Sequence, residues 1–232
     1  MSASASERVT NVLLALLRVG LDPGPEAPGF DPGFDQVWPA RSAEEIDAAL
    51  TRLNGHRLVI EAAGAPGLNL ALARLQRADL LVETETAAVV AGPVPYLAAL
   101  GLPPDRAAQL EVARAGRSRL VGVIKDDSGG VCISGARLTP WTPGSDWWVR
   151  AVVDDERLCD GHVRSLTVRH VGPSQVYAEV RVGRFRRRSE RGRALQLACD
   201  PAQIVADDVP RERPRSRRTF WAEPKLWRLA LP

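Results

Sequence analysis

Residues 119–138, RLVGVIKDDSGGVCISGARL, consist of two apolar runs joined by a polar turn that contains two glycines. The apolar runs are rich in β-forming residues, and the segment Asp126-Asp127-Ser128-Gly129-Gly130 supplies turn residues, among which glycine readily adopts positive φ. The pattern predicts a β-hairpin. This hairpin separates a first half with helical patterns from a second half that is rich in strands and arginine.

The same turn contains Asp127-Ser128-Gly129-Gly130, which resembles the sequence around the nucleophile of trypsin-like serine proteases. Such a serine needs a histidine to accept its proton and an acid to orient the histidine. Only His56 precedes Ser128, without that family's histidine motif, and Val131 stands where proline usually follows. We therefore interpret the segment as a plain turn and predict no catalytic residue.

Helical patterns dominate the chain before the hairpin. Apolar residues at helical spacing predict helices at residues 9–17, 42–53, 68–75, 94–100 and 104–116. Strands are expected at residues 57–61 and 79–82, so the helix between them completes a small strand–helix–strand unit.

The turn Gly64-Ala65-Pro66-Gly67 within that unit invites comparison with phosphate-binding loops. A Walker loop, however, has a lysine followed by serine or threonine, and the dinucleotide fingerprint has three spaced glycines. Neither pattern is present, so nucleotide binding is not favoured by the sequence.

Strand patterns dominate after the hairpin, at residues 147–153, 162–171, 175–185 and 194–199, and they suggest an antiparallel meander or small barrel. The expected fold class is therefore α+β, with a helical N-terminal part followed by an antiparallel β part. The expected divisions are residues 1–116, residues 117–209, and a basic arm with an apolar tail at residues 210–232.

Charge is distributed unevenly along the chain. Residues 1–115 hold 9 Lys and Arg against 14 Asp and Glu, whereas residues 116–232 hold 22 against 14. Guanidinium groups bind phosphate bidentately and stack on bases, so an arginine-rich β region can grip nucleic acid or an acidic protein. The candidate binding residues are Arg181, Arg184, Arg186, Arg187, Arg188, Arg191, Arg193, Arg215, Arg217 and Arg218.

Aromatic residues in a proline- and glycine-rich segment and in the apolar tail are candidates for docking on another protein. They are Phe30, Phe34, Trp38, Trp221 and Trp227. The alternative interpretation is that such aromatics fold back onto their own domain.

The three cysteines, Cys132, Cys159 and Cys199, suit buried reduced thiols better than disulfides. Cys159 and His162 have C-x-x-H spacing, but a structural zinc site normally presents two tight pairs, so we expect no metal and no cofactor. No apolar run approaches the roughly 18 residues that span a bilayer, so a soluble, cytoplasmic chain without a membrane partner is expected.

Residues 97–150 faintly resemble the helix-then-hairpin stretch of the EspG chaperones of type VII secretion, but no specific motif is shared, and we assign no family. The leading hypothesis is a non-catalytic subunit or adaptor whose arginines dock on nucleic acid or an acidic partner. The alternative is a protein-binding adaptor or chaperone that uses its aromatic segments. An enzyme without a legible active site comes third.

Overall fold

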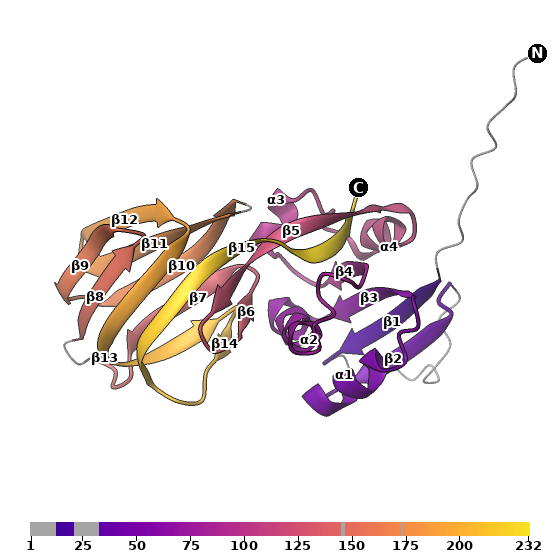
Figure 1. The fold of residues 1–232 in the computed structure, drawn as a ribbon, viewed down its shortest axis with the longest axis horizontal. Coiled ribbons are helices and arrows are strands. Elements are labelled where there is room, and N and C mark those ends of the chain that lie inside the picture. The colour runs from indigo at the N-terminus through magenta and orange to yellow at the C-terminus, as the bar shows by residue number, and fades with distance from the viewer. Residues whose placement is uncertain (1–12, 21–32, 145–146, 173) are drawn as a thin grey trace, which may run out of the picture.

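The computed structural model describes residues 13–20, 33–144, 147–172 and 174–232. The chain forms two lobes that lie side by side (Figure 1). The N-terminal lobe contains the described residues up to 116 and the adjoining ends of two long strands, and the β lobe contains the rest.

The centre of the N-terminal lobe is a parallel sheet. Its strands are β1 (Leu14–Val19), β2 (Gln36–Ala40), β3 (Arg57–Ala62) and β4 (Thr86–Val90), in the spatial order β2-β1-β3-β4. Every residue of β3 and β4 is buried. Strands of parallel sheets read as continuous apolar runs because helices cover both faces.

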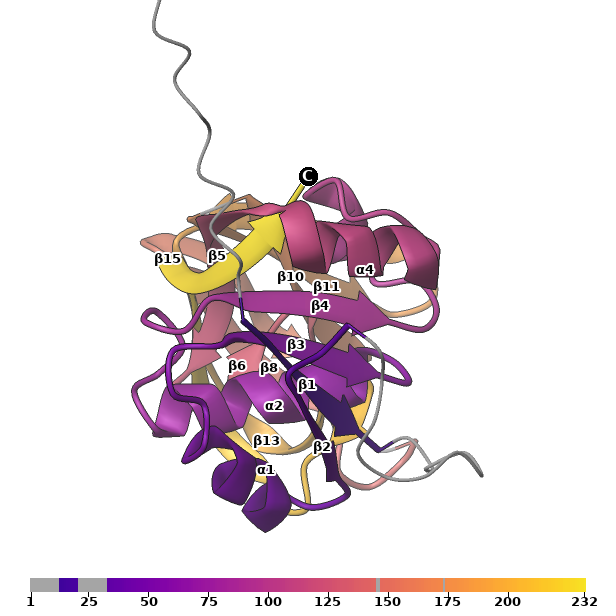
Figure 2. The same cartoon turned by 90° about the vertical axis from the view of Figure 1, so that its right-hand side faces the viewer.

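Helices lie on both faces of this sheet, as Figure 2 shows. α1 (Ala43–Leu50) and α2 (Ala65–Arg77) pack on one face, α4 (Arg106–Ala115) packs on the other, and α3 (Pro95–Ala99) follows β4. The N-terminus of α1 is capped by Ser42, whose Oγ accepts a hydrogen bond from the backbone N–H of Glu45. The lobe is thus a three-layer, doubly wound α/β unit.

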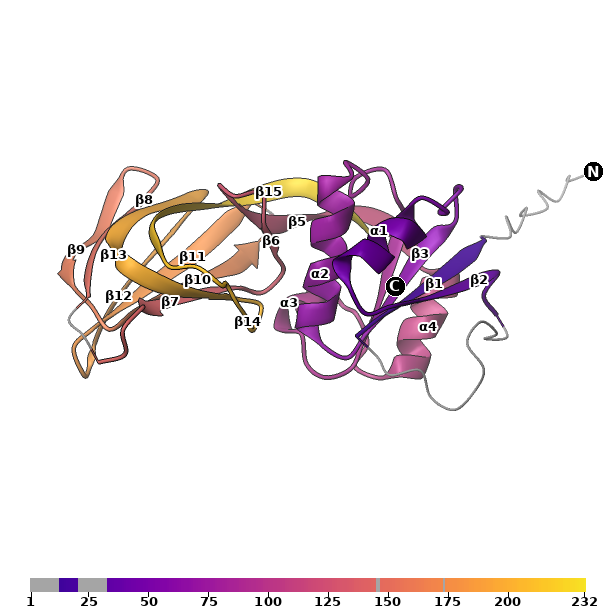
Figure 3. The same cartoon turned by 90° about the horizontal axis from the view of Figure 1, so that it is seen from below.

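Two long strands join the lobes, β5 (Arg117–Asp126) and β15 (Arg215–Leu231), as Figure 3 shows. They pair antiparallel with each other, and the end of β15 pairs parallel with β4 through Leu229 and Thr86. The indole N–H of the fully buried Trp227 donates to Thr86 Oγ1. The C-terminal strand is therefore built into the core of both lobes.

The β lobe is an antiparallel sandwich. Its remaining strands are β6 (Val131–Cys132), β7 (Gly135–Pro140), β8 (Trp148–Val153), β9 (Glu156–His162), β10 (Ser165–Gly172), β11 (Gln175–Val182), β12 (Arg186–Gly192), β13 (Ala194–Ala206) and β14 (Val209–Pro210). The first half of β13 pairs with β8 and β15, and its second half pairs with β7, with an irregularity between Ala198 and Ala202. β13 therefore belongs to both layers.

Alternation along the strands separates the two faces of the sheet β7-β10-β11-β12. Leu166, Val168 and Val180 are fully buried in the core of the β lobe. Thr167 and Arg169 occupy the intervening positions of β10, and Arg137 is the cross-strand partner of Thr167. This polar outer face forms one wall of a cleft between the two lobes.

The expected fold class is wrong in its N-terminal part. Residues 14–17, which were expected within a helix, belong to β1, and residues 79–82, expected as a strand, lie in a turn region. The N-terminal part is consequently a four-stranded parallel α/β sheet with helices on both faces, because a continuous apolar run such as LALLRV can be buried from both sides as a strand.

Candidate functional site: the cleft between the lobes

A cleft of about 1350 Å³ lies between the two lobes. The N-terminal lobe contributes Ala65, which follows β3, and Pro93, Pro95 and Tyr96, which follow β4; the β lobe contributes the outer face of β7 and β10. In open α/β sheets, ligands bind beyond the carboxyl ends of the parallel strands. The cleft has this position, and its volume suits a small molecule of nucleotide size.

Cationic side chains dominate the wall formed by the β lobe and β5. The arginines that line the cleft are Arg119, Arg137, Arg169, Arg181 and Arg187. The acidic side chains along it are Glu179, Asp207 and Asp208, and Glu179 lies 3.7 Å from the guanidinium of Arg187. The cleft therefore attracts anionic ligands, and guanidinium groups bind phosphate bidentately.

Tyr96 and His170 meet in the cleft wall, one from each lobe. Their ring centroids are 4.3 Å apart, and the hydroxyl of Tyr96 donates to the carbonyl of Gly122. Burial raises the pKa of Tyr96 to about 12 and lowers the pKa of His170 to about 4. Both rings are therefore neutral near pH 7 and offer aromatic surface to a ligand beside the arginines.

Asp207 lines the cleft, and its hydrogen bonds connect segments of both lobes. Its buried carboxylate accepts hydrogen bonds from the backbone N–H groups of Ile133, Ser134 and Gly135, at 2.7, 2.8 and 3.0 Å. It also accepts from the side-chain amide of Asn69 in α2, at 2.7 Å. Burial raises the pKa of Asp207, and these donors oppose the increase. The carboxylate thus joins the two lobes at the base of the cleft.

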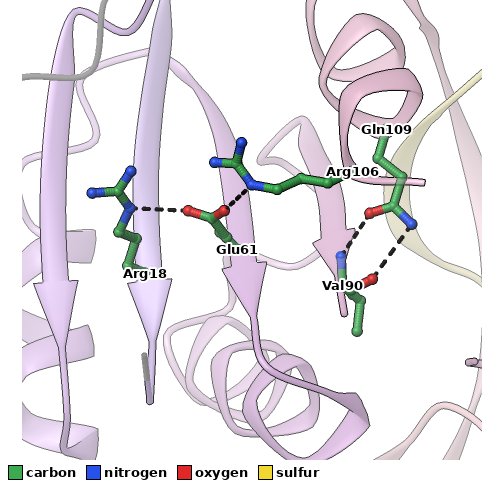
Figure 4. Close-up of polar contacts among 5 residues, drawn as sticks. All are labelled: Arg18, Glu61, Val90, Arg106 and Gln109. Atoms are coloured by element: carbon green, nitrogen blue, oxygen red, sulfur yellow. Dashed lines mark hydrogen bonds and ion pairs between the residues drawn. The ribbon is translucent and has the colours of Figure 1, made fainter. Parts of the chain in front are cut away.

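A second polar cluster lies at the carboxyl ends of β1 and β3 (Figure 4). Glu61, only 7% exposed, accepts a hydrogen bond from Nε of Arg18 at 2.9 Å and another from Nε of Arg106 at 2.6 Å. Burial raises the pKa of Glu61, but the two arginines outweigh it and hold that pKa below its usual value. The ionised carboxylate ties β1, β3 and α4 together.

Gln109 fixes the end of β4 through hydrogen bonds of its side-chain amide. Its buried side-chain oxygen accepts from the backbone N–H of Val90 at 2.8 Å, and its amide nitrogen donates to the carbonyl of the same residue at 3.5 Å (Figure 4). The amide nitrogen also donates to the carbonyl of Pro103 at 2.9 Å. Because β4 leads directly into Pro93 and Tyr96, Gln109 positions the segment that lines the cleft.

Replacing Glu61 by glutamine is expected to destabilise the protein by about 1–2 kcal/mol at neutral pH, since an ionised acceptor for two arginines is lost. Because the pKa of Glu61 is lowered on folding, its stabilisation is present above the unfolded pKa, near 4.5, and is lost as the pH falls through the folded value. Urea unfolding of wild type and Glu61→Gln at about pH 7 and about pH 4 measures this. The difference should shrink at the lower pH, and an equal difference at both would contradict the assignment.

The structure disperses the arginines that the sequence singled out. Arg181 and Arg187 line the cleft, whereas Arg218 is buried and donates to Asp127 at 2.7 Å. The others are exposed on β12, on β15 or in the turns that flank β12: Arg184, Arg186, Arg188, Arg191, Arg193, Arg215 and Arg217. Arg119, Arg137 and Arg169 were not among the candidates, because they lie outside the two arginine-rich runs and come together only in the folded chain.

The aromatic docking candidates lie mainly against their own chain. Trp227 is fully buried, Trp38 is buried beside the N-terminal core, and Phe34 is partly buried against it. Trp221 is partly buried, with its indole N–H donating to Glu223, and Phe30 lies outside the described residues.

Ser128 of the hairpin turn is hydrogen-bonded within the turn, and the three cysteines are buried. Ser128 Oγ donates to the buried Asp126, so the hydroxyl serves the turn. Cys132, Cys159 and Cys199 are free and buried. Within the described ranges, no three His, Cys, Asp or Glu residues are grouped so as to hold a metal ion.

Comparison with known proteins finds the fold but no sequence family. No family model and no curated protein matches the sequence. A diacylglycerol kinase from Bacillus anthracis matches the structure with a TM-score of 0.69 and 8% identity, over 96% of this chain and 97% of that one. An NAD kinase from Archaeoglobus fulgidus in complex with ATP matches with a TM-score of 0.54 and 12% identity, over 94% and 93%.

Yeast NADH kinase complexed with NADH also matches, with a TM-score of 0.53 and 11% identity, over 96% of this chain and 84% of the kinase. These likenesses extend over both lobes, so the chain has the fold of these kinases. The hypothesis of a non-catalytic subunit, adaptor or chaperone that docks on nucleic acid or protein is overturned by this whole-length match to enzymes. The faint resemblance to secretion chaperones is not supported either.

One sequence signal did point to the site. The turn Gly64-Ala65-Pro66-Gly67 joins a buried strand to a helix, and in the structure Ala65 borders the cleft. A glycine-containing turn does not identify a binding site by itself, because the sequence does not reveal the order of the parallel strands around it.

None of the described helices is long and apolar enough to cross a membrane.

Proposed function

We propose that the chain binds a nucleotide in the cleft between its lobes, with arginines of the β lobe holding the phosphate groups. The observation that carries the proposal is the set of five arginines lining one cleft of about 1350 Å³ at the carboxyl ends of β3 and β4. Two of the solved structures with this fold contain nucleotides, ATP in one and NADH in the other. A cytoplasmic location is part of the proposal, and three free buried thiols support it.

The residues around the cleft fit phosphate better than they fit a magnesium ion. Magnesium prefers one or two carboxylates together with phosphate oxygens. Of the carboxylates along the cleft, Asp207 is occupied by four N–H donors and Glu179 faces Arg187, while Asp208 is exposed. We therefore assign phosphate binding to arginine and derive no step through a metal.

Phosphoryl transfer to a hydroxyl is a second candidate function, which the whole-length likeness to diacylglycerol and NAD kinases favours. Both kinds of kinase are named for a hydroxyl-bearing acceptor, a lipid or a dinucleotide. Incubation with γ-labelled ATP and either acceptor tests this candidate, and a labelled product above the buffer control would support it.

Isothermal titration with ATP, NAD⁺ and adenosine tests the binding proposal. ATP is expected to bind at least tenfold more tightly than adenosine, because only ATP supplies phosphates for the arginines. The affinity for ATP should also fall with salt, since exposed charges are screened. Equal affinity for ATP and adenosine, or no binding of either, would overturn the proposal.

A further inference from the structure

The end of the β lobe that lies away from the N-terminal lobe carries exposed aromatic and cationic side chains together. β10 ends at the cleft, where His170 contacts Tyr96, and β11 returns from there antiparallel. The β11–β12 turn, Gly183-Arg184-Phe185, therefore lies at the opposite end of the sheet. Phe185 is 89% exposed at this turn.

The register places further residues of the same kind at this end. β7 runs antiparallel to β10, with Leu138 opposite Leu166, so Trp141 after β7 and Arg164 before β10 lie near the end that Phe185 occupies. Trp141 is 42% exposed, and Arg164, Arg184 and Arg186 are exposed. We name Trp141, Arg164, Arg184, Phe185 and Arg186 the distal tip.

An exposed phenylalanine between two arginines leaves a large apolar ring in water, so a partner that covers the ring gains free energy. Transfer of the Phe185 ring to an apolar phase would bury a large apolar area, and the ring is not part of the core of the β lobe. Tryptophan is favoured at membrane–water interfaces, and arginine is attracted to anionic headgroups. A folded protein partner would offer an apolar pocket as well, but three exposed arginines near two exposed aromatic rings match an anionic surface better.

We propose that the distal tip docks on an anionic lipid bilayer, with Phe185 and Trp141 entering the interface and the arginines binding lipid phosphates. The expectation of no membrane partner rested on the lack of a membrane-spanning run, and a peripheral contact needs none. Two acidic residues of the described part of the chain lie near this end and have other contacts: Asp200 accepts from the backbone N–H of Trp148, and Asp160 lies 4.0 Å from Arg150. None of the distal-tip residues lines the cleft, although Arg187, which follows Arg186, does, so the proposal does not rest on nucleotide binding.

Flotation of the full chain with vesicles tests the proposal. One set contains phosphatidylcholine alone, and the other includes roughly one-third phosphatidylglycerol. The wild type is expected to float with the anionic vesicles and to remain unbound with the neutral ones. Phe185→Ser should lower the partition coefficient about tenfold, as should Arg184→Gln combined with Arg186→Gln.

Val82→Ser is the matched control, because Val82 is an apolar side chain of the N-terminal lobe that is 37% exposed. It should leave flotation unchanged. Circular dichroism and ATP titration of each variant separate loss of docking from loss of folding or of nucleotide binding. Three results would overturn the proposal. They are equal flotation of wild type and Phe185→Ser, wild-type binding to neutral vesicles that equals its binding to anionic ones, and binding to duplex DNA without binding to vesicles.

Discussion

Replacing Asp207 by asparagine is expected to destabilise the protein by about 3–5 kcal/mol. Both carboxylate oxygens accept two hydrogen bonds each, from Ile133 and Asn69 at one oxygen and from Ser134 and Gly135 at the other. An amide has one oxygen, so its NH₂ group would face two buried N–H donors. Chemical denaturation followed by far-UV circular dichroism measures the loss.

Asp208→Asn is the matched control for this prediction. Both aspartates have positive φ, 45° for Asp207 and 66° for Asp208, and asparagine tolerates that conformation. Asp208 is exposed, so its substitution should change stability by no more than about 0.5 kcal/mol. Similar losses for the two variants would mean that the buried carboxylate is not what joins the lobes.

Arg137→Gln combined with Arg169→Gln is expected to weaken ATP binding about 100-fold. Arg137 and Arg169 lie on neighbouring strands of the cleft wall, Arg137 opposite Thr167 and Arg169 two positions further along β10. Each charge-assisted hydrogen bond to phosphate contributes about 1.5 kcal/mol or more, and two such losses multiply to this factor. Isothermal titration at constant salt measures the change.

Arg150→Gln combined with Arg157→Gln removes the same charge from β8 and β9, outside the cleft. Binding of ATP to this control should weaken less than threefold, through the general field alone. If both double variants bind ATP equally weakly, the arginines act only through net charge, and the cleft assignment fails.

The helices of the N-terminal lobe could be predicted because their signals are local. The capping residues Ser42 and Glu45 and the apolar spacing of Leu68, Leu72 and Leu75 were sufficient for α1 and α2. The first strand could not be predicted, because the apolar run at residues 14–19 satisfies both a helix and a buried parallel strand. β2 was missed because its proline lies in a segment that reads as a loop.

The cleft could not be predicted for a different reason. Its residues extend from Ala65 to Leu231, and Arg137 and Arg169 become neighbours only through the pairing of β7 with β10. The continuous run of arginines in the sequence points instead to the β11–β12 hairpin, where Arg186 and Arg188 are exposed on an edge strand. Single arginines on strands that are far apart in the sequence give no sign that the fold brings them together.

Photolabelling with an azido derivative of ATP, followed by peptide mass spectrometry, tests most directly whether the cleft between the lobes is the nucleotide site. The labelled residues are expected within segments 93–100, 119–122, 134–137 and 165–172, which line the cleft, and excess ATP should abolish the labelling. Saturable labelling confined to residues 148–162, or labelling that excess ATP does not reduce, would contradict the assignment of the cleft.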